Sequence, residues 1–552
     1  NAVGTSLDAL TTLSLANVTG ATNLNSTATS LDLTVNDVDG AVDLGVTADT
    51  VETLNLTSTG VASVFAADIA AATALNITAN ADLNLTGSTV TALETVDITG
   101  AGDVTLGDVS PAATDITAST ATGDISATVD NSTNVATGAG ADTITIEATA
   151  TNDIDGTVNL GAGNDTLVLD GDDNTVPTGT VDGGADNDTV SMTSANAQAY
   201  DNNTNFATAI SGFERLTISD RIDVTGGVTI DLEALGFTNY VTLSGTTDGT
   251  DDTGATADGD NLTLSGLASG ATLVLTDTQT ANVGDALDIP TTIASVTDAA
   301  TGTSDVLNVV TQVVQGDIDA GTLVAADVET INITADDTDA DHDSDGNLFE
   351  AGERQTSTLD LNAVNATSVV IDGDANLTLD MTGNTAVTSI DASGMTGALT
   401  ATAFGTATLT GGSGADALTA DGSGDTLIGG AGDDTLTGAN LTSMTGGAGA
   451  DTFVMNTSAN VNSYSTIEDL ATGDIIDVSN VTSTGQSFVS SAVTLANTAV
   501  FQDFANAAVN QLATDNDDFA WFQFGGDTYI VGNDNQVDGA NDDFENGVDS
   551  II

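Results

Sequence analysis

The chain has 552 residues and carries 81 Asp and Glu against 3 Arg and no Lys, which gives a formal net charge of −78. Three cations cannot supply the basic surface that nucleic acid or anionic lipid requires, and no apolar stretch is long enough to span a bilayer. No Cys is present, so disulfides and zinc–thiolate sites are excluded. The single histidine, His342, rules out any two-histidine metal site.

The composition nevertheless predicts an ordered chain. Hydrophobic residues make up 40% of it and Pro occurs only 3 times, whereas disordered acidic segments are poor in β-branched residues. Asp outnumbers Glu by 71 to 10, and Asp favours turns and metal sites over helices. We therefore expect an all-β, extracellular protein. Because the chain begins at Asn1 without a signal peptide, we expect a processed or truncated product.

Residues 1–136 repeat a short strand pattern at a nearly constant interval. Two apolar residues flank one polar residue in each copy, at Leu13/Leu15, Leu33/Val35, Leu54/Leu56, Leu75/Ile77 and Val96/Ile98. Side chains i and i+2 of a strand share a face, so each pair points inward while Asn55, Asn76 and Asp97 point outward. One strand per fixed period of about 20 residues predicts a β-solenoid, which we expect to continue along the chain as one elongated structure.

Residues 137–191 contain three Gly- and Asp-rich turns, TGAGADTIT at 137–145, LGAGNDTLV at 160–168 and GGADNDTVS at 183–191. Their aspartates, Asp142, Asp165 and Asp188, are equally spaced. The equal steps predict coils of that length with one calcium-binding turn in each. The alternative is a row of tight turns that hold no metal.

Residues 192–410 favour a less regular β-solenoid, which is interrupted by an acidic insertion at 339–353. Strands are expected near 213–219, 328–334, 368–374 and 388–394. The insertion opens with D-x-D-x-D-G, as an EF-hand calcium loop does. Gly352 stands where that loop has its bidentate Glu, and a Glu follows directly after it. We predict a calcium loop in which His342 points outward and is no catalyst. Its expected ligands are Asp341, Asp343, Asp345, Asn347 and Glu353.

Residues 411–454 hold the strongest pattern, the nonapeptide G-G-x-G-x-D-x-U-x. It occurs as GGSGADALT at 411–419, GGAGDDTLT at 429–437 and GGAGADTFV at 446–454, with a degraded copy at 420–428. Glycines allow the tight turn that directs carbonyl groups to one point, and the aspartate adds a hard oxygen ligand. This pattern binds Ca²⁺ in RTX proteins. The predicted calcium-binding residues are Gly411, Gly412, Gly414, Asp416, Asp425, Gly429, Gly430, Gly432, Asp434, Gly446, Gly447, Gly449 and Asp451.

Two nonapeptides should complete one coil of a parallel β-roll. Asp416 and Asp434 then fall on the same edge, two nonapeptides apart, and a Ca²⁺ ion between stacked turns would bridge them. Asp425 should lie on the opposite edge, with Ser443 in the equivalent place one coil later. The alternative is a Gly- and Asp-rich turn row without metal, in which the stacked carboxylates would repel one another.

Residues 455–552 concentrate the aromatic side chains and predict an aromatic-rich β cap on the open end of the stack. The segment FAWFQFGGDTYIV at 519–531 is typical of a hairpin that turns at its two glycines. The pattern at 466–481 commonly ends RTX blocks, and it makes Asp474 a further candidate ligand. The alternative there is a capping strand with ordinary aspartate turns.

Several phrases resemble the RTX-type S-layer proteins of stalked alphaproteobacteria. They include VETINITADDT at 328–338, NTAVTSIDASGMTG at 384–397, GGSGADALT at 411–419 and WFQFGGDTYIV at 521–531, and the resemblance covers roughly residues 130–531. It implies a calcium-dependent crystalline lattice on the cell surface, with a hexagonal arrangement, secreted by a type I system without a cleaved N-terminal signal.

The sequence departs from that family in three respects. No helical N-terminal domain is evident, which in the family anchors the lattice to lipopolysaccharide. The insertion at 339–353 is additional. The chain is also far more acidic, which suggests a saline habitat where high ionic strength screens like charges.

Two other functional classes stay open beside an S-layer that assembles with itself. One is an extracellular RTX adhesin or calcium-stabilised surface filament. The other is a secreted RTX enzyme whose catalytic domain lies outside this sequence. Within the chain, no H-E-x-x-H and no nucleophile elbow occur, so we expect no enzymatic activity here.

Overall fold

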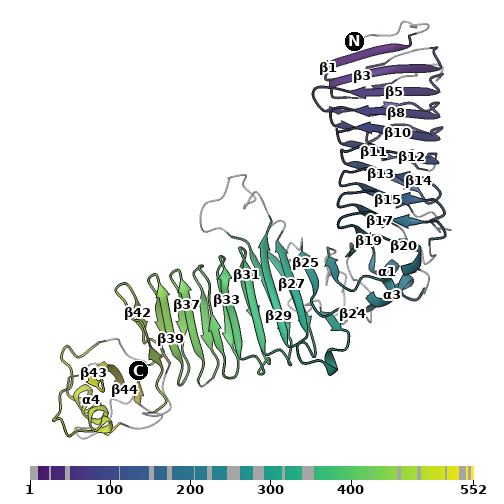
Figure 1. The fold of residues 1–552 in the computed structure, drawn as a ribbon. Coiled ribbons are helices and arrows are strands. Elements are labelled where there is room, and N and C mark those ends of the chain that lie inside the picture. The colour runs from purple at the N-terminus through teal and green to yellow at the C-terminus, as the bar shows by residue number, and fades with distance from the viewer. Residues whose placement is uncertain are drawn as a thin grey trace, which may run out of the picture. The chain divides into compact units, whose positions relative to one another are not determined.

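The computed structural model describes most of the chain. It leaves out residues 1–9, 21, 24–26, 41, 44–49, 111, 148–153, 171–176, 204–205, 221–226, 245–260, 278–290, 314–316, 339–353, 423, 457–461, 482–486, 516–518, 534–542 and 545–548. Of the described residues, 50% are in strands and 7% in helices, and the long sheets are parallel, so the prediction of a β-solenoid or β-roll is confirmed (Figure 1). No helix among the described residues is long and apolar enough to cross a membrane.

The chain divides into two compact units, which we describe separately. The first contains Asn1–Ile222, Val228–Gly245 and Leu264–Leu267, and the second contains Asp223–Gly227, Thr246–Thr263 and Ala268–Ile552. In both units, successive coils add their strands in parallel register to the same sheets. Inward side chains are apolar and outward ones are short and polar, which is the alternation that a half-buried strand requires.

One sheet of the first unit consists of β1 (Thr12–Val18), β3 (Ser30–Val38), β5 (Thr53–Ser58), β8 (Ala74–Ala79), β10 (Thr95–Gly100), β12 (Asp115–Thr117), β14 (Asn134–Ala136), β16 (Val158–Asn159), β18 (Val181–Asp182) and β20 (Ile210–Ser211). The second consists of β6 (Ser63–Val64), β9 (Leu83–Asn84), β11 (Val104–Asp108), β13 (Ile125–Asp130), β15 (Thr143–Glu147), β17 (Thr166–Asp170), β19 (Thr189–Met192), β21 (Arg215–Ile218) and β23 (Tyr240–Leu243). A short third sheet holds β2 (Thr22–Asn23), β4 (Val42–Asp43) and β7 (Ala67–Asp68).

The outward polar residues of the first coils stack into a ladder. Asn55 donates a side-chain hydrogen bond to Asp32 at 2.7 Å, and Asn76 donates one to Asn55 at 2.7 Å. Asp97 continues this column next to Asn76. The predicted outward positions are therefore confirmed, and hydrogen bonds between side chains of successive coils reinforce the backbone ladder.

One register prediction is wrong. The repeat pattern places Leu33 beside Leu54, whereas Leu31 pairs with Leu54 and Leu33 pairs with Leu56. The register is therefore shifted by one inward position at this point. The reason is the length of β3, which buries three apolar side chains in succession, Leu31, Leu33 and Val35. With three inward positions, the pattern of the strand alone permits two registers.

Among the described residues, the first unit contains three short helices that its sequence pattern does not predict, α1 (Ser194–Asp201), α2 (Phe206–Ala209) and α3 (Leu232–Leu235). Thr193 caps α1, since its side chain accepts a hydrogen bond from the backbone N–H of Asn196 at 3.2 Å. The ring of Tyr200 stacks on that of Phe206 at 4.5 Å between centroids. The first two helices lengthen their coil, so Thr189 pairs with Arg215 at a longer step than in the coils before it.

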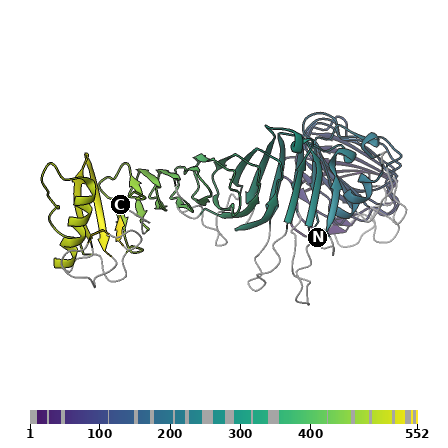
Figure 2. The same cartoon turned by 90° about the horizontal axis from the view of Figure 1, so that it is seen from below.

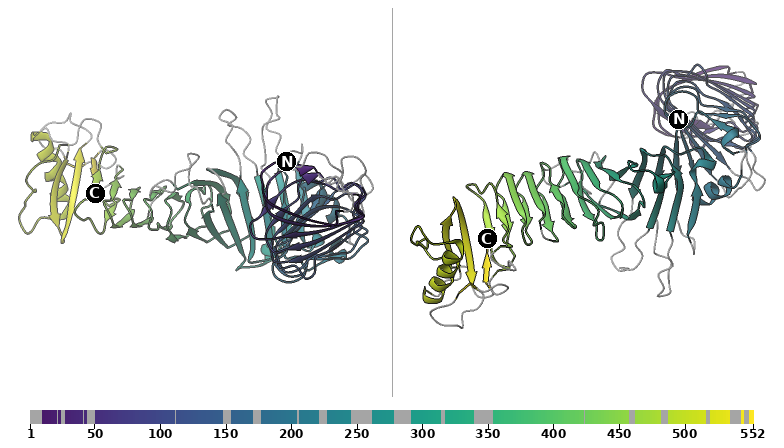
Figure 3. Two further views of the ribbon diagram at one scale, coloured as in Figure 1. Left: turned by 90° about the horizontal axis from the view of Figure 1, so that it is seen from above. Right: turned by 60° about the horizontal axis from the view of Figure 1, so that its bottom comes forward.

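The second unit continues the same architecture with two facing rows of strands (Figure 3). One row holds β25 (Ala271–Asp277), β27 (Val306–Val313), β29 (Thr330–Asp337), β31 (Ser368–Gly373), β33 (Ser389–Met395), β35 (Thr408–Thr410), β37 (Thr426–Ala431), β39 (Ser443–Ala448) and β41 (Thr466–Ile467). The other holds β26 (Thr291–Val296), β28 (Ile318–Val324), β30 (Thr356–Asn362), β32 (Asn376–Asp380), β34 (Leu399–Ala403), β36 (Ala417–Ala420), β38 (Thr435–Thr437), β40 (Thr452–Val454) and β42 (Ile475–Asp477). The strands expected near 213–219, 328–334, 368–374 and 388–394 are present as β21, β29, β31 and β33.

Coil length varies in the second unit and is short at the nonapeptides. Asn332 donates a side-chain hydrogen bond to Asn308 across a step of 24 residues. Between Asp416 and Asp434, which are also joined by a hydrogen bond, the step is 18 residues. The apolar residue of each nonapeptide is fully buried, as is that of the degraded copy. These core residues are Leu418, Leu427, Leu436 and Phe453.

The sequence predicts a β cap for the C-terminal segment, but the segment also contains a helix. The hairpin is confirmed, with β43 (Phe519–Phe524) antiparallel to β44 (Asp527–Asn533), which also pairs with β45 (Asp549–Ile551). A 15-residue helix, α4 (Phe501–Asp515), lies against these strands (Figure 2). Its apolar residues recur at helical spacing and pack on the strands; they are Phe501, Phe504, Ala505, Ala508, Val509 and Leu512.

Candidate calcium-binding turns

The aspartates of the nonapeptides form a row that joins successive coils. The backbone N–H of Leu399 donates to Oδ1 of Asp416 at 2.7 Å. In the same way, the N–H of Asp416 donates to Asp434 at 2.8 Å, and the N–H of Asp434 donates to Asp451 at 3.0 Å. Asp474 ends this C-terminal aspartate row, since its Oδ1 accepts from the N–H of Asp451 at 3.1 Å. The predicted edge that Asp416, Asp434 and Asp451 share is therefore confirmed.

Glycine is required at defined points of these turns. Gly430 has φ +114°, and a Cβ built on it would collide with the carbonyl oxygen of Gly412 in the preceding coil. A Cβ on Gly429 would collide with Oδ2 of Asp434 and lie 2.5 Å from the carbonyl oxygen of Gly446. A carboxylate oxygen and a carbonyl oxygen therefore approach the same side of Gly429. Only a residue without a side chain leaves this space open.

A second row lies in the first unit and has the same construction. The N–H of Ile125 donates to Oδ1 of Asp142 at 2.7 Å, that of Asp142 to Asp165 at 2.7 Å, and that of Asp165 to Asp188 at 2.8 Å. The side chains of Asp142, Asp165 and Asp188, which we call the N-terminal aspartate row, are completely buried. The predicted equal coils are confirmed, because the last two of these hydrogen bonds each span 23 residues.

In both rows, Oδ1 of each aspartate accepts a hydrogen bond from the neighbouring coil. In four of these aspartates, Oδ2 has no hydrogen-bond partner among the described residues. Oδ2 of Asp142, Asp165, Asp188 and Asp434 is enclosed and accepts no hydrogen bond within the described part of the chain. A buried anionic oxygen without a partner is strongly destabilising, so each of these groups requires either a proton or a cation.

The pKa values of the buried aspartates also show that their environment disfavours the charged form. The pKa of Asp165 is raised to about 7, chiefly by burial and also by the negative charges of Asp142 and Asp188, against the lowering effect of the N–H of Asp142. Burial likewise raises the pKa of Asp434 to about 6. In the chain without metal, these carboxylates are therefore much harder to ionise than an exposed aspartate.

The arrangement fits a hard cation that takes oxygen ligands. Among the described residues, no three Asp, Glu, His or Cys side chains gather into a metal-binding group. Any ion held in the turns would therefore combine carboxylate oxygens with backbone carbonyl groups, and Ca²⁺ accepts such mixed sets of six to eight oxygens. The two described arginines have other contacts. Arg215 lies over the ring of Tyr240 at 4.5 Å, and Arg354 donates to Thr396 at 2.9 Å.

The opposite edge of the roll holds Asp425, whose two oxygens both accept from backbone N–H groups, as those of Asp416 do. Oδ1 of Asp425 accepts from the N–H of Ala407 at 2.9 Å, and its Oδ2 accepts from the N–H of Gly422 at 3.4 Å. The equivalent residue one coil later is Thr442 and not Ser443, because Ser443 pairs with Thr426. The prediction missed by one position since this coil is shorter than the preceding one, in which Thr426 pairs with Thr408. Asp425 therefore has partners for both oxygens and no aspartate above it.

Two other predictions concern the insertion at 339–353 and Asp474. The expected ligands of the insertion, Asp341, Asp343, Asp345, Asn347 and Glu353, lie outside the described residues. Asp474 is held at both oxygens, since its Oδ2 accepts from the N–H of Ala471 at 2.6 Å. This arrangement agrees with the capping interpretation of Asp474, and its part in calcium binding stays a prediction.

Sequence reasoning missed Glu214, which ends the N-terminal aspartate row. The N–H of Asp188 donates to Oε2 of Glu214 at 3.0 Å. The same relationship recurs in the second unit, where the N–H of Asp305 donates to Oε2 of Glu329 at 2.8 Å. An available signal was that both glutamates directly precede a strand, as Asp165 and Asp188 do.

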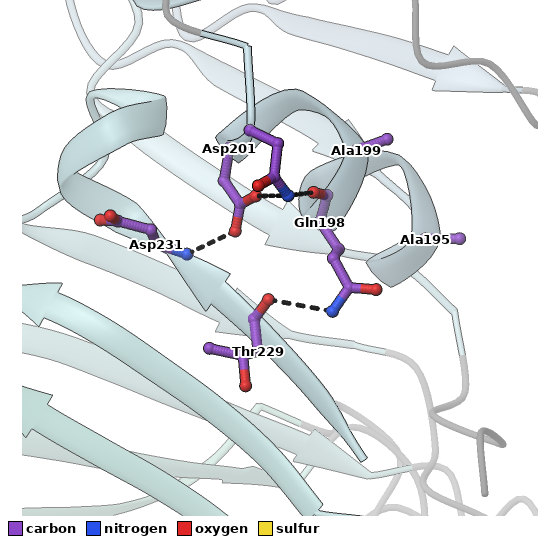
Figure 4. A pocket seen from close by; sticks show the side chains of 7 residues that line it. Ala195, Gln198, Ala199, Asp201, Thr229 and Asp231 are labelled. Carbon is purple, nitrogen blue, oxygen red and sulfur yellow. Dashed lines mark hydrogen bonds between the residues drawn. The ribbon is translucent and has the colours of Figure 1, made fainter. Parts of the chain in front are cut away.

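A hollow lies between α1 and β22 (Val228–Asp231), and unlike the turns it is lined by polar groups that have hydrogen-bond partners (Figure 4). Both oxygens of Asp201 are used, since they accept from the side chain of Asn202 at 2.7 Å and from the N–H of Asp231 at 2.8 Å. Gln198 donates to the carbonyl oxygen of Thr229 at 3.2 Å. These polar groups therefore join α1 to the neighbouring strand, and we assign no ligand to the hollow.

Comparison with known proteins gives no relative from which a function could be transferred, because no family model and no curated protein matches the chain.

Proposed function

We propose that this chain is a secreted structural protein that binds several Ca²⁺ ions and assembles with itself into an S-layer lattice on the cell surface. The observation that carries the proposal is the pair of aspartate rows. The N-terminal row contains three enclosed carboxylate oxygens that have no hydrogen-bond partner among the described residues, and the C-terminal row contains one, Oδ2 of Asp434. Ca²⁺ would complete the coordination of these oxygens and offset their mutual repulsion.

The net charge of the chain also favours a role for cations in the assembly of copies. A net charge of −78 with 3 Arg and no Lys makes two copies of the chain repel each other strongly. Basic side chains are too few to join acidic surfaces between copies. Divalent cations that bridge acidic loops provide the missing attraction, and they make assembly depend on the identity of the ion as well as on ionic strength.

The resemblance to S-layer proteins supports a planar lattice over other calcium-dependent structures. It also supports type I secretion and attachment to lipopolysaccharide through an anchor region. The stacked coils support a structural role, because a solenoid presents regular faces along which identical copies can repeat.

Negative-stain electron microscopy of the purified chain tests the proposal. We expect an ordered planar lattice at millimolar Ca²⁺, since extracellular calcium modules bind at about 10⁻⁴–10⁻³ M. Mg²⁺ should substitute poorly because it demands a tighter octahedron and releases its waters reluctantly. NaCl at equal ionic strength should screen charge without producing order. The same lattice in NaCl alone would show that bridging ions are not needed, and filaments or monomers in Ca²⁺ would contradict the lattice.

A further inference from the structure

The N-terminal aspartate row ends at a turn that is not part of any nonapeptide-like pattern. Glu214 lies one coil beyond Asp188, and its Oε2 accepts from the N–H of Asp188 as the aspartates do elsewhere in the row. The carbonyl oxygen of Asp188 in turn accepts from the N–H of Glu214 at 3.1 Å and from that of Arg215 at 3.0 Å. The two turns are therefore fixed directly against each other, and Glu214 occupies the next position of the row.

The space beside these two turns is lined by oxygen atoms. The side chain of Asp188 is completely buried, and its Oδ2 has no hydrogen-bond partner among the described residues. A Cβ on Gly183 would collide with the carbonyl oxygen of Gly212 and would lie 2.8 Å from Oδ2 of Asp188. A partnerless carboxylate oxygen and a carbonyl oxygen of the next coil thus face the same glycine. This is the arrangement seen at Gly429 in the nonapeptides.

We propose that a Ca²⁺ ion binds between the turn at 183–188 and the turn at 212–214, with Glu214 as a ligand beside Oδ2 of Asp188 and the carbonyl oxygen of Gly212. This inference rests on the proposed calcium binding of the rows and adds a site that the nonapeptide pattern does not predict. Carboxylate and carbonyl oxygens are the ligands that Ca²⁺ prefers. Glutamate keeps the hydrogen bond to the preceding coil and brings a second carboxylate to the ion.

The site has a structural consequence for the helical coil. Helices α1 and α2 lie between Asp188 and Glu214 and make this coil longer than those before it. An ion held by both ends of that coil would close it as a loop. The same N–H to Oε2 contact at Asp305 and Glu329, again with an enclosed Oδ2 on the aspartate, shows that the arrangement is used twice.

Calcium titration by calorimetry, combined with hydrogen exchange on the full chain, tests the site with Glu214→Gln. The amide oxygen can still accept from the N–H of Asp188, so the substitution removes mainly the charge. We expect one Ca²⁺ site to weaken by roughly tenfold or more, since ligand charge sets affinity. Peptides covering 194–214 should lose the protection that Ca²⁺ gives, while peptides covering 411–454 keep it. Glu94→Gln is the matched control, because Glu94 is exposed and also directly precedes a strand, β10.

The outcomes separate this site from the proposed function. If the unaltered chain binds Ca²⁺ and the Glu214→Gln chain has the same affinities and exchange as Glu94→Gln, Glu214 is no ligand and the proposed function still stands. If the unaltered chain binds no Ca²⁺, both proposals are wrong. Glu214→Ala provides a second variant, since it removes both carboxylate oxygens and should lose the same ion. Full Ca²⁺ binding by Glu214→Ala, if Glu214→Gln fails to fold, would overturn the site.

Discussion

The backbone N–H of Asp416 donates to Oδ1 of Asp434, one coil further along the chain, at 2.8 Å. The N–H of Asp142 donates to Oδ1 of Asp165 in the same way at 2.7 Å, in the other compact unit of the chain. Each aspartate thus uses one oxygen to hold the coil before it. The position of the second oxygen is thereby fixed, and in Asp142, Asp165, Asp188 and Asp434 it is enclosed without a partner among the described residues.

The two edges of the C-terminal roll should contribute unequally to calcium binding. Asp434→Ala should reduce the affinity for Ca²⁺ more than Asp425→Ala does. Asp434 has aspartates on both sides and an oxygen without a partner among the described residues, whereas both oxygens of Asp425 accept hydrogen bonds from backbone N–H groups. Calorimetric titration of the two variants measures this difference, and equal losses would show that the two edges are equivalent.

The stability of the metal-free chain should depend on pH through Asp165. Burial raises its pKa from 3.8 to about 7, so the folded state binds this proton more tightly than the unfolded state does. Stability from the proton is fully present below about pH 4 and is lost as the pH rises through about 7. In excess chelator, the melting temperature should therefore fall across this interval, and the gain from added Ca²⁺ should grow.

Asp165→Asn is the control for this pH dependence, because the amide keeps a similar shape and does not titrate. Thermal melts monitored by circular dichroism in chelator should show a flatter pH profile for this variant. General repulsion at a net charge of −78 acts on both proteins, so the difference between the profiles isolates the buried carboxylate. Parallel profiles would mean that Asp165 is not a buried acid of raised pKa.

Gly430→Ala should destabilise the roll more than Gly383→Ala. Both glycines have positive φ values, +114° and +94°, which cost a residue with a side chain about 1–3 kcal/mol. Only at Gly430 would the new Cβ also collide with a carbonyl oxygen of the preceding coil, while Gly383 has open space. Denaturant unfolding in Ca²⁺ compares the two free energies of unfolding. A larger loss at Gly383 would argue against close stacking of the nonapeptide turns.

The C-terminal segment should depend on its aromatic core. Phe522 is completely buried and stacks on Tyr529 at 5.2 Å between ring centroids. Phe522→Ala should cost about 3–5 kcal/mol and unfold α4 together with the hairpin. Phe488 is 46% exposed, so Phe488→Ala should cost much less. Near-ultraviolet circular dichroism and proteolysis of residues 501–551 compare the two variants, and equal behaviour would contradict a core centred on Phe522.

The repeated parts of the fold could be predicted because spacing alone determines which residues stack. Aspartates separated by 18 and 23 residues fall into rows once each coil has that length, and Asp416, Asp434, Asp165 and Asp188 do so. Prediction failed where the coil length changes. The helices α1 and α2 lengthen the step after Asp188, so the periodicity does not extend to Glu214.

Local ambiguity explains the remaining differences. The three inward side chains of β3 allow two registers, and only the packing of Leu31 against Leu54 selects one. In α4, the spacing of Phe501, Phe504 and Val509 suits a helix, but the aromatic content of the whole segment favoured strands. Hydrogen bonds such as that from Asp188 to Glu214 depend on side-chain length and local geometry, which a sequence pattern does not record.

Far-ultraviolet circular dichroism with limited proteolysis, in excess chelator and then after Ca²⁺ is restored, tests the central claim most directly. The enclosed carboxylates of Asp142, Asp165, Asp188 and Asp434 should become unfavourable when Ca²⁺ is removed at neutral pH. We expect chelation to lower the β signal and increase protease sensitivity, and Ca²⁺ to reverse both changes where Mg²⁺ does so poorly. Identical spectra, melting temperatures and cleavage patterns with and without chelator would contradict the claim that calcium holds these turns together.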